Sequence, residues 1–169
     1  MPVPSRPVSA TTIASEWGQQ VHDYTFAPAG CRVSGVGIFM LTANAYRDGS
    51  INTADEDPAG YLDAANDRVE VPADGAGLYL IILSAITDHG AASDETGIVM
   101  RLNGSEIGRV QVGNEDETEV SMQMTLVEPL TVGDQISLRC RQIGSGTRAA
   151  VAVRSLTLIR IGAELGAPS

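Results

Sequence analysis

The sequence predicts an all-β protein: a jelly-roll β-sandwich of about eight to ten antiparallel strands, preceded by a short N-terminal extended arm and helix. Three observations support this fold class. Beyond residue 30, apolar and polar residues alternate with a period of two, and the β-branched residues Val, Ile and Thr are frequent. Turn residues recur roughly every ten positions, which is the spacing of short strands in a sandwich.

The first 30 residues differ in composition from the rest and form a separate N-terminal region. Prolines, among them Pro4 and Pro7, restrict residues 1–10 to extended backbone. Residues 11–24 predict a short helix, which is marginal alone in water and needs a surface to pack on. We therefore expect residues 1–30 to be a docking segment, although Trp17 folding back onto its own domain is an alternative. The expected docking residues are Pro4, Pro7, Ile13, Trp17, Val21 and Tyr24.

Several strands can be placed individually in residues 31–169, the predicted jelly-roll domain. Residues 120–126 and 135–141 alternate strictly, with Cys140 on the apolar face of the second run. Asn103-Gly104 between two such runs is a strong hairpin signal. Residues 78–86 are apolar on both faces, which predicts a strand covered on both sides. The alternation in the last run slips near Arg154, where we expect a β-bulge.

Charge and cysteine content exclude several classes of protein. Lys and Arg number 11, all of them Arg, against 21 acidic residues, so the net charge is −10. This charge repels nucleic acid, and no apolar run is long enough to span a membrane. The sequence shows no secretory signal, and the only two cysteines, Cys31 and Cys140, make no disulfide framework. We expect reduced thiols from a cytosolic folding compartment, with no nucleic-acid partner and no membrane insertion.

Catalytic and metal-binding patterns are weak. His22 and His89 have no neighbours at metal-ligand spacing, and no nucleophile elbow or phosphate loop is present. Asp48, Ser50 and Asn52 begin like a calcium loop but lack its later glycine and glutamate. A glycosidase using two carboxylates is the remaining enzymatic alternative. We expect a protein that is not an enzyme, with no catalytic residue, cofactor or metal.

Three motifs, in the right order, resemble the tumour necrosis factor and complement globular-head superfamily. They are a strand ending in Pro72 with Gly-x-Tyr opening the next strand at residues 77–79, the Asn103-Gly104 hairpin, and a leucine and Gly-Asp step at residues 130–136. The match covers roughly residues 40–161. It departs from the family in the closing strand, which lacks the phenylalanine often found there.

This resemblance implies a ten-strand jelly roll that assembles as a homotrimer. The apolar strand at residues 78–86 agrees with this, because a strand facing both core and neighbour needs apolar residues on both sides. Aromatic residues expected near the trimer axis are reduced here to three tyrosines. The expected trimer contacts are Tyr46, Tyr61, Tyr79, Ile81 and Leu83.

The opening, from Pro4 through Tyr24, resembles the start of small virion proteins from tailed phages of actinobacteria. The resemblance implies a non-enzymatic virion component, assembled in the host cytoplasm. It would be a minor tail or fibre-like protein docked to other virion proteins through residues 1–30. Its trimeric head would be displayed for contact with a host surface glycan or protein. The alternatives are a capsid decoration protein and a free-standing ligand-binding module of the same fold.

Overall fold

The computed structural model describes residues 29–36, 44, 46–88, 95–113, 119–144 and 151–163. Within these ranges the chain is all-β and contains no helix, so no helix there is long and apolar enough to cross a membrane. The strands are β1 (Gly30–Val36), β2 (Tyr46–Asp48), β3 (Thr53–Glu56), β4 (Leu62–Asp63), β5 (Arg68–Glu70), β6 (Gly77–Asp88), β7 (Glu95–Leu102), β8 (Ser105–Gly113), β9 (Glu119–Leu130), β10 (Gln135–Ile143) and β11 (Val151–Ala163).

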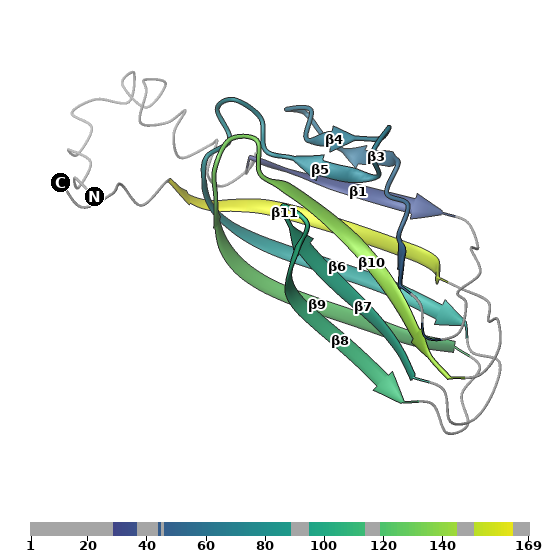
Figure 1. Cartoon of the computed structure of the whole chain (residues 1–169). Helices are drawn as coiled ribbons and strands as arrows, with labels where there is room; N and C mark the ends of the chain where they lie inside the picture. The colour runs from purple at the N-terminus through teal and green to yellow at the C-terminus, as the bar shows by residue number, and fades with distance from the viewer. Residues whose placement is uncertain are drawn as a thin grey trace, which may run out of the picture.

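The strands form two antiparallel sheets packed face to face, which confirms the predicted jelly-roll sandwich (Figure 1). A five-stranded sheet has the order β3-β1-β11-β6-β9. The other sheet has the order β4-β5-β10-β7-β8, and β2 pairs with β10 off this path. Neighbouring strands are therefore mostly distant in sequence, as in Greek-key connections. In Figure 1, β10, β7 and β8 lie in front of β11, β6 and β9.

The predicted hairpin at Asn103-Gly104 joins β7 to β8. Both turn residues have positive φ, 50° at Asn103 and 83° at Gly104, which is the geometry of a type I′ turn. Asn103 also accepts a hydrogen bond from the Gln135 backbone (2.9 Å) and donates to Asp134 (2.7 Å). The asparagine therefore ties this hairpin to the start of β10.

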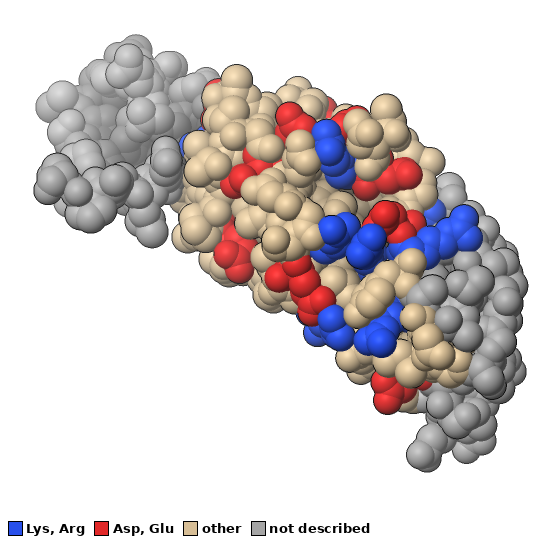
Figure 2. All heavy atoms as spheres, in the orientation of Figure 1, with Lys and Arg blue, Asp and Glu red and all other residues tan. Residues whose placement is uncertain are grey.

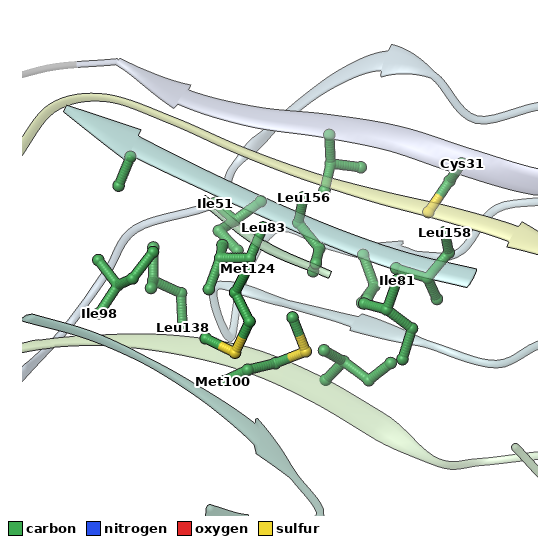
Figure 3. Packing of buried hydrophobic residues seen from close by; sticks show 14 of the residues in the cluster. Cys31, Ile51, Ile81, Leu83, Ile98, Met100, Met124, Leu138, Leu156 and Leu158 are labelled. Atoms are coloured by element: carbon green, nitrogen blue, oxygen red, sulfur yellow. The ribbon is translucent and has the colours of Figure 1, made fainter. Parts of the chain in front are cut away.

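The core lies between the two sheets and is built mainly from aliphatic and sulfur-containing side chains (Figure 3). Leu83, Met124 and Leu156 from one sheet meet Met100 and Leu138 from the other. These are the inward positions of alternating strands, so the alternation in the sequence determined which side chains are buried. Cys31 and Cys140 lie in the same core as free thiols, 4% and 0% exposed, as predicted for Cys140.

A β-bulge lies close to the expected position near Arg154. The pairing of β11 with β6 shifts register between Val151 and Val153 and again between Arg160 and Gly162, whereas Arg154 keeps the alternation. Its side chain points inward and is 3% exposed, and its Nε donates a hydrogen bond to the Ser50 carbonyl. A Cβ at Gly35 would collide with that carbonyl, so glycine makes room for the contact. Arg154 therefore occupies an inward position of β11 that is otherwise filled by apolar side chains.

Candidate interaction surface

Strand β6 presents two different apolar faces, as expected from its sequence. Tyr79, Ile81, Leu83 and Ala85 point into the core and are at most 2% exposed. The alternating residues point to the outer face of the five-stranded sheet and are partly exposed. These are Leu78, Leu80, Ile82, Ser84 and Ile86. Within one chain the strand is therefore covered on one side only.

Rows of side chains continue this outer face across β11 and β9. Leu80 lies between Ile159 of β11 and Val127 of β9, and Val127 is 51% exposed. The next row places Ile82 between Thr157 and Thr125. One half of the face is thus apolar, bordered by threonines.

The following row on the same face is small and polar. Ser84 lies between Ser155 and Gln123. A hollow of about 390 Å³ opens around these three side chains, bordered also by Ile86 and Ser121. A second, larger hollow of about 870 Å³ lies nearer the sheet edge, where residues 56–59 border β1 and β11.

No outward side chain at positions 78–86 of β6, 121–129 of β9 or 155–159 of β11 carries a charge. Charged residues make up 19% of the chain, and exposed strands ordinarily carry them. A broad uncharged face with an apolar half is typical of surfaces that bind another protein. We call this region, made of those outward positions, the uncharged face.

Four of the five predicted trimer contacts lie in the core and not on the uncharged face. Tyr61, Tyr79, Ile81 and Leu83 are 0–1% exposed within the single chain, so they have no surface left for a neighbour. Their assignment as surface contacts is wrong because they occupy the inward positions of their strands. Only Tyr46 is exposed, at 39%, and it lies on the other sheet. The residues that sequence reasoning missed are Leu78, Leu80, Ile82 and Ile86, one position away on β6.

The two buried tyrosines form a polar contact inside the core. Their hydroxyl oxygens are 2.9 Å apart, and the rings meet edge to face. Tyr79 also donates to the Gly75 carbonyl in the turn before β6. Burial, followed by the contact with Tyr79, raises the pKa of Tyr61 well above its ordinary value. This arrangement stabilises the turn but leaves neither hydroxyl open to a ligand.

All six predicted docking residues lie outside the described residues, as do His22 and His89. The incomplete calcium loop is described, and its side chains have protein partners. Asp48 accepts a hydrogen bond from Arg139 (2.6 Å), and Ser50 donates to Asp67 (2.6 Å). In the described part of the chain, no three His, Cys, Asp or Glu side chains are grouped to hold a metal ion. Burial raises the pKa of both the Cys31 and the Cys140 thiol to about 12, so neither is an activated nucleophile.

The architecture matches known structures at low sequence identity. The globular domain of zebrafish complement 1qA protein superposes over 81% of this chain and 99% of its own, with a TM-score of 0.60 and 10% identity. The Eiger tumour necrosis factor of S. frugiperda superposes over 84% of this chain and 99% of its own, with a TM-score of 0.57 and 12% identity. The fold is that of the complement and tumour necrosis factor heads.

A viral protein shares this fold. The PRD1 vertex protein P5 superposes over 79% of this chain and 73% of its own, with a TM-score of 0.61 and 16% identity. No family model matches the sequence, and no curated protein matches it either. These likenesses establish the jelly-roll fold, and the fold implied by the predicted resemblance to the globular heads is confirmed.

Proposed function

We propose that this chain is a non-enzymatic structural protein of a phage virion. Its jelly-roll domain assembles as a homotrimer through the uncharged face, and residues 1–30 dock it to other virion proteins. A minor tail or fibre-like position with contact to a host surface is the specific role proposed, and a capsid decoration protein is the alternative.

The uncharged face is the observation that best supports the proposed trimer. Leu78, Leu80, Ile82 and Val127 leave a row of aliphatic side chains in water in the single chain. Covering such a surface contributes roughly 25 cal/mol per Å² of apolar area removed from water. A neighbouring copy that packs on this face also covers the uncharged rows around Thr157 and Ser84. A closed ring of three copies satisfies all equivalent faces at once.

The virion assignment is supported by the shared fold of the PRD1 vertex protein P5. It is supported further by the resemblance of residues 4–24 to the start of phage virion proteins. The absence of an enzymatic role is proposed because the buried groups of unusual pKa (Cys31, Cys140, Tyr61) are enclosed in the core.

The solution mass tests the assembly. Light scattering on the purified chain is expected to give three times 17.7 kDa, about 53 kDa. A mass of 17.7 kDa that persists at high concentration would contradict the trimer.

Antibodies raised against the jelly-roll domain test the location. Immunogold labelling of purified particles of the phage that encodes the chain is expected at the tail. Labelling spread over the capsid would favour the decoration role, and labelling absent from intact particles would contradict a virion protein.

A truncated chain tests the docking segment. A chain lacking residues 1–30 is expected to keep the mass of a trimer but to lose incorporation into phage particles.

A further inference from the structure

A cluster of arginines around one exposed tyrosine lies on the outer face of the six-stranded sheet, opposite the uncharged face. The guanidinium carbons of Arg141, Arg139 and Arg109 are 4.9, 5.9 and 6.0 Å from the centre of the Tyr46 ring. Figure 2 shows this side of the molecule, with blue and red side chains gathered over it. We call the cluster the Arg–Tyr patch. It comprises Tyr46, Asp48, Arg101, Glu106, Arg109, Arg139 and Arg141.

Strand pairing builds the patch from segments far apart in sequence. Tyr46 and Asp48 of β2 lie opposite Arg141 and Arg139 of β10. Arg139 in turn lies opposite Val99 of β7, which lies opposite Arg109 of β8. Val99 shares the outward direction of its two arginine neighbours but is only 2% exposed. The patch therefore has an apolar floor beneath its charged groups.

Two carboxylates hold most of the guanidinium groups in place. Arg139 donates to Asp48 at 2.6 Å, and Arg101 lies 3.7 Å from the same carboxylate. Arg109 binds both oxygens of Glu106, at 3.0 and 2.6 Å. Guanidinium groups that are already fixed lose less conformational entropy when they bind a ligand.

Arg141 is different. No carboxylate of the described residues forms an ion pair with it, and its Nε is buried there without a hydrogen-bond partner. Four arginines against two carboxylates leave the patch with a positive charge in a chain of net charge −10. Clustered guanidinium groups repel one another unless an anion joins them, and their planar forks suit carboxylates.

We propose that the Arg–Tyr patch binds an acidic segment of another protein, with a carboxylate of that segment accepting hydrogen bonds from Arg141. Tyrosine and arginine over an apolar floor are the residues that carry binding energy in protein interfaces. Screening confines charge effects to about 8 Å at physiological salt, so a short acidic segment is attracted by the patch alone. A long polyanion extends beyond it onto an acidic surface and is repelled. The inference does not rest on the trimer, because the two faces belong to different sheets.

Binding of a defined probe tests the proposal. The probe is a fluorescent capped peptide of alternating Glu and Asp, measured by anisotropy at physiological ionic strength, with the Gln and Asn peptide as its neutral counterpart. The full chain is expected to bind the acidic peptide and not the neutral one. Arg141→Gln should weaken binding by about tenfold, because a charge-assisted hydrogen bond is lost. Arg141→Lys should weaken it less, because it keeps the charge but not the fork.

Arg32→Gln is the matched control, since Arg32 is an exposed arginine on the other sheet. It is expected to bind the peptide like the unaltered chain. Equal losses in Arg141→Gln and Arg32→Gln would overturn the proposal, as would failure of the unaltered chain to bind the acidic peptide. Tighter binding of an oligogalacturonate of equal charge would also overturn it and would indicate an acidic glycan. Thermal melts of each variant exclude loss of folding as the cause.

Discussion

The two outer faces of the sandwich are built on the same kind of sheet and yet differ in chemistry. The uncharged face carries leucine, isoleucine, threonine and serine at its outward positions on three adjacent strands. The opposite face carries the Arg–Tyr patch. Both faces cover one shared core, so stability alone does not require them to differ. The contrast supports the two proposals made above, that one face packs against copies of the chain and the other binds a different partner.

The largest effect on assembly is expected from a charge placed on the uncharged face. Ile82→Glu is expected to reduce the solution mass from the trimer toward 17.7 kDa, because the carboxylate would be buried without a partner at an interface. Gln111→Glu places the same group at an exposed position of β8 on the other sheet and should leave the mass unchanged. Dissociation by both variants would mean that the faces are not distinct in assembly.

Substitutions of two leucines of β6 should distinguish the core from the uncharged face. Leu83→Ala is expected to lower the free energy of unfolding by about 3 kcal/mol, through lost burial and a cavity, at every protein concentration. The effect of Leu80→Ala should shrink on dilution, because part of its burial comes from a neighbouring copy. Denaturant titrations at several concentrations measure both. Identical behaviour of the two variants would contradict the division of β6 into two faces.

Low pH should weaken the ion pair between Arg109 and Glu106 in the Arg–Tyr patch. The hydrogen bond from Arg109 lowers the pKa of Glu106 below its ordinary 4.5, against a smaller opposing effect of desolvation and with help from the Arg109 and Arg141 charges. Because the folded value is the lower one, the stabilisation is present above pH 4.5 and is lost as the pH falls through the folded pKa. An NMR titration of the Glu106 carboxyl should show this depressed midpoint, and Arg109→Gln should raise it. A midpoint unmoved by that substitution would show that the ion pair does not form in solution.

The smallest effect is expected at Asp48. Asp48→Asn removes an exposed partner of Arg139 and Arg101 and should change the free energy of unfolding by less than about 1 kcal/mol. The same change makes the patch more positive and should strengthen binding of the acidic peptide. A variant that binds the peptide more weakly would indicate that Asp48 matters chiefly by holding the arginines in place.

The sequence predicted local features well and face assignments poorly. Alternation and the turn signal at Asn103 predicted strands and a hairpin because both depend on neighbouring residues. In β6 both sets of alternating residues are apolar, so the pattern could not show that Ile81 faces the core and Ile82 does not. The sequence could not show that Arg154 is buried, because its partner, the Ser50 carbonyl, lies 104 positions away.

The Arg–Tyr patch could not be predicted from the sequence, because its residues come from distant segments. Tyr46 and Arg141 come together only through the pairing of β2 with β10, and no local sequence pattern predicts that pairing. Tyr46, predicted as a trimer contact together with Tyr61 and Tyr79, is exposed on the six-stranded sheet, whereas the other two tyrosines are buried. The sequence showed which residues could form contacts, whereas the face of the sandwich on which each of them lies depends on tertiary structure.

The position of β11 has a consequence for synthesis of the protein on the ribosome. This strand, the last in chain order, lies between β1 and β6 and pairs with both. Until residues 151–163 emerge, β1 and β6 each lack the strand that pairs with one of their edges. Folding must therefore be late and dominated by contacts between distant segments, which is a slow route that exposes strand edges. On the ribosome, those two strand edges stay open until the β11 segment has been synthesised.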